Sequence, residues 1–304
     1  MYRLQDFITV KQINQKISIE YRVKIQFSVS EDALRFINQL KSGECSFDNV
    51  GAYEDVLKKL IHLHYAVDIR NMLPKKAGNS RLQYYLSYYV DDPIKAIEKL
   101  KKARIAILGL GGVGTIILQN LVGNGIEQFV LVDFDKVESS NHNRQFIFKD
   151  SDVGSLKTKA CSRYVKERNK DASCILINDM IENEGQIDDL IKKYHIDYLV
   201  AAIDHPRNIQ SICYKAAKDN KVHFLQGGIG IDFGSYGVKA DAPLQSSKYL
   251  KGPDVILGSF GPTNTIISAF MANDIIMSTL GLPTMLGGAD ELIIDFNSRK
   301  ILKR

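Results

Sequence analysis

The spacing of hydrophobic positions changes twice along the chain, at about residue 30 and again after residue 93. Between residues 17 and 29, alternating apolar side chains predict β-structure with one buried face, formed by Ile17, Ile19, Tyr21, Val23, Ile25 and Phe27. From Ser30, which has the chemistry of an N-cap, the spacing becomes helical, and a second helix is predicted at about 53–66. We interpret residues 1–78 as a small winged-helix-like domain.

Residues 79–304 alternate between helical and strand-like segments, which is typical of an α/β domain. The Pro, Gly, Lys and Ser of residues 74–80 are typical of a linker before it. After a predicted helix at 93–103, apolar runs without polar alternation predict buried parallel strands: RIAILGL, FVLVDFD, ASCILIND, DYLVAAID and VHFLQGGI. We therefore expect a doubly wound, Rossmann-like mixed sheet, with a hairpin turning at residues 297–298.

Composition and charge narrow the classes of function. The 304 residues are 45% hydrophobic and 25% charged, which fits a globular protein with a sizeable core. The net charge of +5 suits anionic ligands. The sequence contains no dense basic helix of the kind that would favour binding to nucleic acid. The N-terminus lacks the apolar core of a signal peptide. Asn273 and Asp274 interrupt the apolar stretch 265–282, which therefore predicts a buried helix and not a membrane span. We expect a cytoplasmic protein that binds neither membranes nor nucleic acid.

A glycine-rich loop predicts a phosphate site. The sequence GLGGVG follows a predicted strand and opens a predicted helix, with glycines at Gly109, Gly111, Gly112 and Gly114. Such a loop turns tightly, lets the backbone approach a ligand, and presents the free N–H groups of a helix N-terminus to phosphate oxygens. Asp133 ends the next strand, where it can bind ribose hydroxyls. These features alone fit any nucleotide, a dinucleotide, or a tight turn without a ligand.

Cationic residues downstream narrow the expected ligand to a triphosphate. VLVDFD, which ends in the candidate contact residue Asp135, is followed by ESSNHNRQ and DVGSLK. A triphosphate under attack requires cations such as Arg144 and Lys157, whereas hydride transfer does not. Asp204 follows another strand at the carboxyl edge of the sheet, as either a Mg²⁺ ligand or a helix N-cap. His205 is either a turn residue or a contact to nucleotide or substrate.

The ordered motifs GLGGVG, LVDFD, SSNHNRQ and VGSLK resemble those of the ubiquitin-activating-enzyme-like adenylyltransferases, over roughly residues 80–304. The resemblance implies binding of ATP and Mg²⁺, attack of a carboxylate on the α-phosphate, and a homodimer. Its implied roles are nucleotide contacts at Gly111 and Asp133, phosphate and ribose contacts at Ser140, Asn141 and Arg144, a catalytic Lys157 and a metal-binding Asp204. Family members often supply an arginine from the neighbouring subunit; Arg81 is the candidate, with a solvated linker arginine as the alternative.

The cysteines depart from this family's pattern. Its sulfur-carrier enzymes usually hold zinc with two CxxC pairs, but the four cysteines here are widely spaced: Cys45, Cys161, Cys174 and Cys213. We therefore expect free thiols in a reducing compartment and no structural zinc. Cys213 falls inside a predicted helix, which is a poor position for a thioester or a persulfide.

The N-terminal part resembles the precursor-peptide recognition elements of ribosomal-peptide tailoring enzymes. Together with the AIDHP string, the layout is similar to the microcin C and pantocin A peptide-modifying enzymes. This resemblance implies a leader peptide that adds as a strand near residues 23–29, against the helix around 56–63. A dimerisation arm and a DNA-binding winged helix are the alternatives.

These observations predict ATP- and Mg²⁺-dependent adenylation of a carboxylate, or a terminal amide, on a ribosomally made precursor peptide, as a step in the maturation of an antibiotic or another natural product. The first alternative is activation of a sulfur-carrier or ubiquitin-like protein. A nucleotide-binding signalling protein and an NAD-dependent oxidoreductase are the other two.

Overall fold

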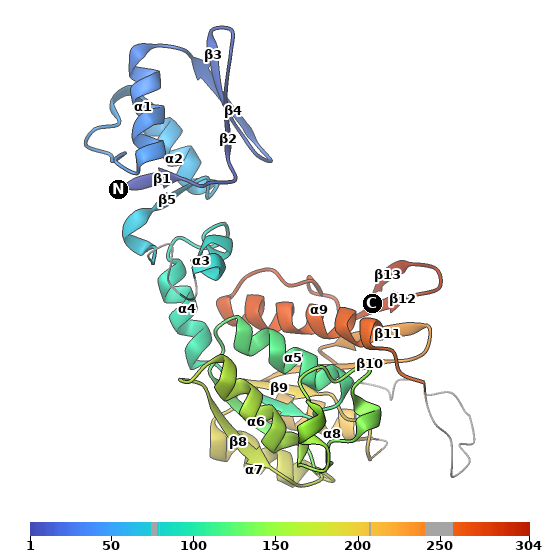
Figure 1. Cartoon of the computed structure of the whole chain (residues 1–304). Helices are drawn as coiled ribbons and strands as arrows, with labels where there is room; N and C mark the ends of the chain where they lie inside the picture. Colours follow the sequence, from blue (N-terminus) through green and yellow to red (C-terminus); the bar gives the residue numbers. More distant parts are fainter. Residues whose placement is uncertain (74–77, 79, 207, 241–257) are drawn as a thin grey trace. The chain divides into compact units, whose positions relative to one another are not determined.

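In a computed structural model the chain folds as two compact units, Met1–Glu98 and Lys99–Arg304 (Figure 1). The structure describes residues 1–73, 78, 80–206, 208–240 and 258–304. Most of the predicted linker therefore lies outside the described residues. The predicted division at residue 78, between peptide recognition and adenylation, is a division of function and stays a prediction.

The first unit contains a three-stranded antiparallel sheet in the order β2-β3-β4 and a separate antiparallel pair of β1 and β5. The strands are β1 (Tyr2–Leu4), β2 (Thr9–Ile13), β3 (Lys16–Glu20), β4 (Lys24–Ser28) and β5 (Ala66–Asp68). Ile17 lies opposite Phe27 and Ile19 opposite Ile25, so the alternating run is a hairpin. The prediction that Tyr21 and Val23 belong to the buried face is wrong, because both lie exposed in the turn between β3 and β4.

Helices α1 (Glu31–Ser42) and α2 (Glu54–His62) complete the core of the first unit. The Ala33 N–H donates to Ser30 Oγ at 3.0 Å, which confirms the predicted N-cap. The apolar cluster joins this sheet to both helices through residues that include Ile19, Phe36 and Leu57. Single turns η1 (Gly51–Tyr53) and η2 (Ile69–Asn71), then α3 (Ser80–Leu86) and the start of α4 (Pro93–Lys102), finish the unit. The winged-helix interpretation of this arrangement stays a prediction.

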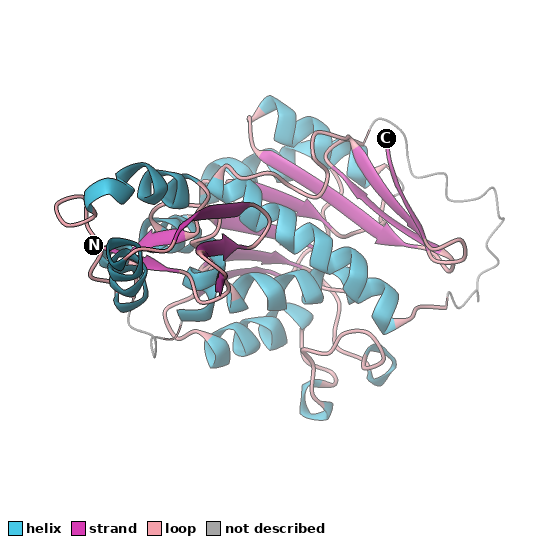
Figure 2. Cartoon of the chain, turned by 90° about the horizontal axis from the view of Figure 1, so that it is seen from above, coloured by secondary structure: helices cyan, strands magenta, loops and turns pink. Residues whose placement is uncertain are grey.

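The second unit is built on an eight-stranded mixed sheet in the order β13-β12-β11-β10-β9-β6-β7-β8 (Figure 2). Five parallel strands confirm the predicted apolar runs: β6 (Arg104–Leu108), β7 (Gln128–Val132), β8 (Ser173–Ile177), β9 (Tyr198–Ala201) and β10 (His223–Ile229). Three antiparallel strands extend it: β11 (Phe233–Gly237), β12 (Glu291–Asp295) and β13 (Lys300–Lys303). The pairing of β12 with β13 confirms the C-terminal hairpin.

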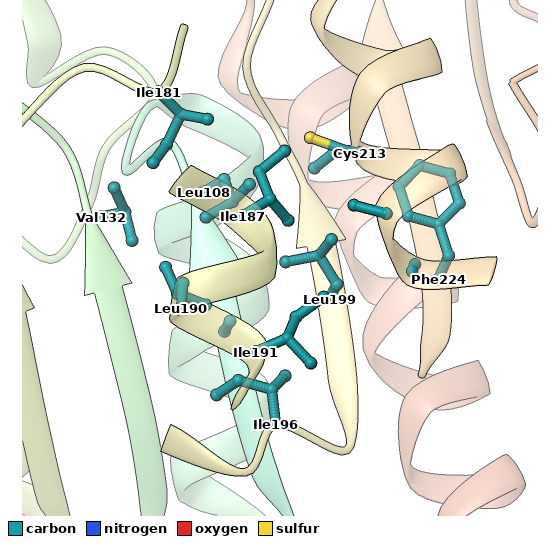
Figure 3. Close-up of a cluster of buried hydrophobic side chains, with 14 of the residues drawn as sticks. Leu108, Val132, Ile181, Ile187, Leu190, Ile191, Ile196, Leu199, Cys213 and Phe224 are labelled. Carbon is teal, nitrogen blue, oxygen red and sulfur yellow. The ribbon is translucent and has the colours of Figure 1, made fainter. Parts of the chain in front are cut away.

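Helices cover both faces of this sheet. Figure 3 shows Leu108 and Leu199 of the sheet against Ile187 and Leu190, in the core beneath α7 (Glu184–Tyr194) and α8 (Ile209–Asp219). Neighbouring residues of a strand point to opposite faces, so the buried Ile107 faces the other layer. That layer contains α5 (Gly112–Gly123), which contacts α6 (Lys157–Arg168) and α9 (Gly261–Leu280). The doubly wound α/β prediction is confirmed.

Helix α9 corresponds to the late apolar stretch, and Asp274 in its middle is buried. Its carboxylate accepts hydrogen bonds from the Tyr236 hydroxyl and from the backbone N–H groups of Met285 and Leu286. The predicted buried helix is therefore confirmed. Among the described residues, no helix combines the length and apolarity that a bilayer crossing requires.

Candidate nucleotide-binding site

The glycine loop connects β6 to α5 at the point where the strand order reverses between β6 and β9. Gly109 has a φ of +89°, and a Cβ atom there would clash with the carbonyl oxygen of Ala202. A Cβ atom on Gly114 would clash with the carbonyl oxygen of Gly109. These two glycines therefore allow α5 to start directly behind the strand, as the sequence predicts.

Unpaired N–H groups mark the start of α5. In the described part of the chain, the backbone N–H groups of residues 111–114 donate to no acceptor. The space that a Cβ atom on Gly111 would occupy has no atom within 4 Å. Free N–H donors at the positive end of a twelve-residue helix, with open space beside Gly111, fit a phosphate group.

Asp133 closes the loop from the neighbouring strand. Its carboxylate accepts hydrogen bonds from the Leu110 N–H at 2.6 Å and from the Asp135 N–H at 2.8 Å. Burial raises the pKa of the Asp133 carboxyl, while the Lys157 ammonium and the two N–H donors oppose that rise. The structure thus places Asp133 beside the loop, and its contact to a ribose stays a prediction.

Lys157 is the first residue of α6 and is buried. Its Nζ lies 2.7 Å from Asp135 Oδ2, and its backbone N–H donates to the Asp135 carbonyl oxygen at 3.0 Å. The structure therefore brings Asp133, Asp135 and Lys157 together, although the sequence separates the lysine from the two acids by more than twenty positions.

Arg144 reaches the glycine loop from the segment after η3 (Ser139–Asn141). Its Nη1 donates to the Ser140 carbonyl oxygen at 2.9 Å and to Asn143 Oδ1 at 2.8 Å. Its Cγ lies 3.4 Å from the position that a Cβ atom on Gly112 would occupy. The predicted cation is therefore next to the first turn of α5.

The side chains of Ser140 and Asn141 are used within their own segment. The Ser140 hydroxyl donates to Glu138 Oε2 at 3.1 Å, and Asn141 Oδ1 accepts the Glu138 N–H at 3.0 Å. Asn141 is buried, whereas Ser140 is exposed. Both shape the segment that carries Arg144, and their contacts to phosphate or ribose stay predictions.

Asn264 on α9 also borders the loop, and the sequence analysis did not find it. Its side chain is buried against Gly112, and its Nδ2 donates to the Phe260 carbonyl oxygen at 2.8 Å. One turn later, the Ser268 hydroxyl donates to the Val113 carbonyl oxygen at 3.1 Å. Nothing local identifies these residues, since their role depends on how α9 packs against α5.

Asp204 and His205 lie exposed beyond the carboxyl end of β9. The N-cap of α8 is Asn208, so the alternative role of Asp204 as that cap is wrong. The Asp204 carboxylate forms no hydrogen bond or ion pair with the described residues, which leaves it open to a cation such as Mg²⁺. Groups of three or more metal-ligating side chains do not occur in the described ranges.

Arg81 lies exposed on α3 of the first unit and forms no hydrogen bond or ion pair with the described residues. Its role, from the partner subunit or as a solvated arginine, therefore stays a prediction.

None of the four thiols is fully exposed. Cys45, Cys161 and Cys213 are buried, and Cys174 is half-buried. Burial raises the pKa of the Cys213 thiol to about 12 and that of Cys174 to about 11. A thiol that is neutral and enclosed is a poor nucleophile.

Comparison with known proteins assigns this architecture to a family. The model of the ThiF family matches residues 90–292. This chain belongs to the ThiF family. The resemblance seen in the ordered motifs is thereby confirmed.

Two curated proteins are similar to part of this chain. The tRNA threonylcarbamoyladenosine dehydratase of Haemophilus influenzae is 35% identical over 137 residues, which cover 44% of this chain and 51% of the relative. A probable molybdopterin-synthase adenylyltransferase of Gracilaria tenuistipitata var. liui is 28% identical over 223 residues, covering 69% and 61%. This chain thus spans only about half to three fifths of these relatives.

Solved structures match the fold over both units. E. coli MccB bound to ATP has a TM-score of 0.79 at 20% identity, covering 100% of this chain and 96% of MccB. MccB, described as a microcin C7 biosynthetic enzyme, in complex with N-formylated MccA gives 0.80 at 20%, with the same coverage. PaaA gives 0.75 at 16%, covering 98% of each chain. These likenesses confirm the Rossmann-like fold.

Proposed function

We propose that this chain is an ATP-dependent adenylyltransferase that activates a carboxylate, or a terminal amide, of a ribosomally made precursor peptide. One observation carries the proposal: the free N–H groups of residues 111–114 and the side chain of Arg144 meet at the same glycine, Gly112. This combination suits a polyphosphate, because N–H donors and a guanidinium together neutralise several phosphate oxygens.

Each group of the site has its own role in the adenylation step. The N–H groups of the loop bind phosphate oxygens and fix the direction of the triphosphate. A carboxylate oxygen of the peptide attacks the α-phosphorus, the bond to the bridging oxygen of pyrophosphate breaks, and an acyl adenylate forms. Attack by a terminal amide oxygen would instead give an O-adenylated imidate and release one proton. Arg144 and Lys157 stabilise the negative charge that grows on the phosphates during this step. Mg²⁺ held by Asp204 and phosphate oxygens would supply further positive charge.

Asp133 and Asp135 position the site rather than react. Asp133 holds the Leu110 N–H and would bind the ribose hydroxyls, and Asp135 fixes the Lys157 ammonium. His205 follows Asp204 directly and is exposed, so it can contact nucleotide or peptide.

The first unit supports a peptide as the substrate. Strand β4 is an edge strand of the β2-β3-β4 sheet, so a further strand can pair with it. MccB is similar to this chain over its whole length and has been solved with MccA. We propose that the leader of the precursor peptide adds to β4, and that a homodimer brings the partner subunit's Arg81 to the site.

Activation of a sulfur-carrier or ubiquitin-like protein is the second candidate, favoured by the adenylyltransferase names among the relatives. The burial of Cys213 argues against thiol transfer after activation, but it does not affect the adenylation step itself.

Pyrophosphate release tests both candidates. Small peptides that co-purify with the chain are identified by mass spectrometry, synthesised, and added with ATP and Mg²⁺ to the purified protein. We expect release only when the peptide is present. Release that is equally fast without any peptide or carrier contradicts the proposal. An adenylated partner ending in Gly-Gly, with no response to peptides, establishes the second candidate instead.

A further inference from the structure

Asn143 bridges Arg144 to the segment that begins α9. The Asn143 Nδ2 donates to the Ser259 carbonyl oxygen at 2.8 Å, and its Oδ1 accepts from Arg144 Nη1 at 2.8 Å. Donating and accepting at once fixes which way the amide points, because only the oxygen can accept from a guanidinium. Arg144 is thereby tied to a residue 115 positions further along the chain.

The guanidinium depends on this bridge for its direction. Nη1 has two acceptors, the Ser140 carbonyl oxygen and Asn143 Oδ1, and it forms no ion pair with a described carboxylate. These two contacts leave Nη2 and Nε free for phosphate oxygens. Without Asn143, one hydrogen bond would remain to orient a long, flexible side chain, and its rotamer freedom would increase.

Close packing holds the other end of the bridge. A Cβ atom on Gly261 would stand 2.6 Å from the Asn143 carbonyl oxygen and 2.7 Å from Phe146 Cζ. A glycine at the first position of α9 therefore permits the helix to approach the Arg144 segment this closely. Asn264, in the same turn of α9, packs against Gly112. The first turn of α9 thus contacts both sides of the phosphate site.

We infer that Asn143 is a positioning residue for Arg144, and that through it the first turn of α9 sets the affinity of the site for a triphosphate. The inference rests on the proposed function only in taking the ligand of Arg144 to be the phosphates of ATP. Asn143 does not touch the reacting atoms; it acts through Arg144 and through the Ser259 carbonyl oxygen.

A purely structural asparagine would behave differently, and the chain contains a matched example. Asn49 is also exposed, donates to the Glu44 carbonyl oxygen at 2.8 Å and accepts the Ser46 N–H at 2.8 Å. It lies in the first unit and forms no hydrogen bond with an arginine of the described residues. Asn49→Ala removes a bridge of the same kind without altering Arg144, and it serves as the control.

The experiment compares the affinities of the full chain for ATP and for AMP, each with Mg²⁺, by isothermal titration calorimetry. Losing one charge-assisted hydrogen bond that orients Arg144 should weaken ATP binding by about 10-fold. AMP has no β- or γ-phosphate, so its affinity should change by less than about 2-fold. Asn143→Ala should therefore reduce the preference for ATP over AMP, while Asn49→Ala leaves it unchanged.

Two further variants test whether Asn143 acts together with α9 and through Arg144. Gly261→Ala, which displaces the first turn of α9 from Asn143, should cause the same selective loss of ATP affinity. In an Arg144→Ala background, Asn143→Ala should have no further effect on the ratio. Circular dichroism identifies folded variants, and Asn143→Gln replaces Asn143→Ala if the latter unfolds.

The results distinguish a failure of the proposed function from a failure of the positioning role of Asn143. If the wild-type chain does not prefer ATP to AMP, the phosphate site fails, and this inference fails with it. If the wild-type chain prefers ATP and both Asn143→Ala and Gly261→Ala keep that preference, the proposed function stands and the positioning role is overturned.

Discussion

Lys157 and Asp135 are joined twice, by an ion pair of 2.7 Å between Nζ and Oδ2 and by a hydrogen bond of 3.0 Å between the Lys157 N–H and the Asp135 carbonyl oxygen. The lysine side chain is 9% exposed, whereas that of the aspartate is 49% exposed. A buried ammonium needs a partner, and this partner stands at the solvent edge. The Lys157 ammonium is therefore held in place, and its remaining N–H donors are available to a phosphate group.

Lys157→Ala should reduce peptide-dependent pyrophosphate release by about 100-fold or more, because it removes a preorganised cation from the charge that develops on the phosphates. Lys159→Ala is the control, since Lys159 lies exposed on the same helix and forms no hydrogen bond or ion pair with the described residues. Release measured with a coupled pyrophosphate assay should be unchanged in this control. A Lys157→Ala variant that is folded and retains activity within a few-fold removes the lysine from the mechanism.

Alanine substitutions at Gly111 and Gly112 should differ in their effect on stability. On Gly112 a Cβ atom would clash with Asn264 Oδ1, so Gly112→Ala should lower the free energy of unfolding by about 1–3 kcal/mol. On Gly111 the same atom meets open space, so Gly111→Ala should change stability by less than about 1 kcal/mol. Urea titration of both variants measures this difference.

Gly111→Ala should nevertheless weaken ATP binding, because its methyl group would occupy the open space beside the residue that begins the run of free N–H groups at 111–114. Calorimetric titration with ATP checks this. Equal ATP affinity of wild-type and Gly111→Ala protein would mean that the ligand does not approach the loop here.

Local signals in the sequence predicted the loop and the parallel strands, because a strand buried on both faces is apolar throughout and a tight turn requires glycine. Helix α7 was not predicted, although Ile187, Leu190 and Ile191 have helical spacing and Asn183 caps the helix. Strand β11 was also missed, because its sequence FGSYG resembles a turn. Gly234 is needed there, since a Cβ atom would meet Ile267 of α9.

The candidate site was predictable only as far as its residues stand in ordered motifs. Arg144 and Lys157 were found in this way. The structure places Arg144 near Gly112 and Lys157 near Asp133. Asn143 and Asn264 were not found, because their contacts depend on the packing of α9 against α5 and the Arg144 segment. Packing between residues more than a hundred positions apart leaves no periodic signal in one sequence.

Asp68 should make the stability of the first unit sensitive to acid. Its carboxylate accepts from the Arg70 side chain and from the Arg70 N–H, and the hydrogen bonds from that side chain contribute most to lowering the pKa of Asp68 below 3.8. A lowered pKa in the folded state stabilises the protein above the unfolded value, and this contribution is lost as pH falls through the folded value.

Asp68→Asn should therefore reduce stability at pH 7 by about 1 kcal/mol, and the difference from wild type should shrink as the pH falls below 3.8. Asp48→Asn is the control, because Asp48 is exposed and forms no ion pair with the described residues. Thermal unfolding followed by circular dichroism at pH 7 and pH 3 gives the two differences. A difference for Asp68→Asn that is the same at both pH values would show that the carboxylate charge is irrelevant.

Cys213 should take no part in catalysis. Burial raises the pKa of this thiol to about 12, so the thiol is neutral at pH 8, and the side chain is buried in α8. Iodoacetamide at pH 8 should leave Cys213 unmodified in the native protein, as peptide mass spectrometry can measure, while the half-buried Cys174 is modified first. Unfolding in urea should make both reactive.

Cys213→Ala should retain pyrophosphate release within about 2-fold, because a small cavity in the core lowers stability without changing the reacting groups. A folded Cys213→Ala variant that releases pyrophosphate but no longer forms the final product would instead assign the thiol to a step after adenylation.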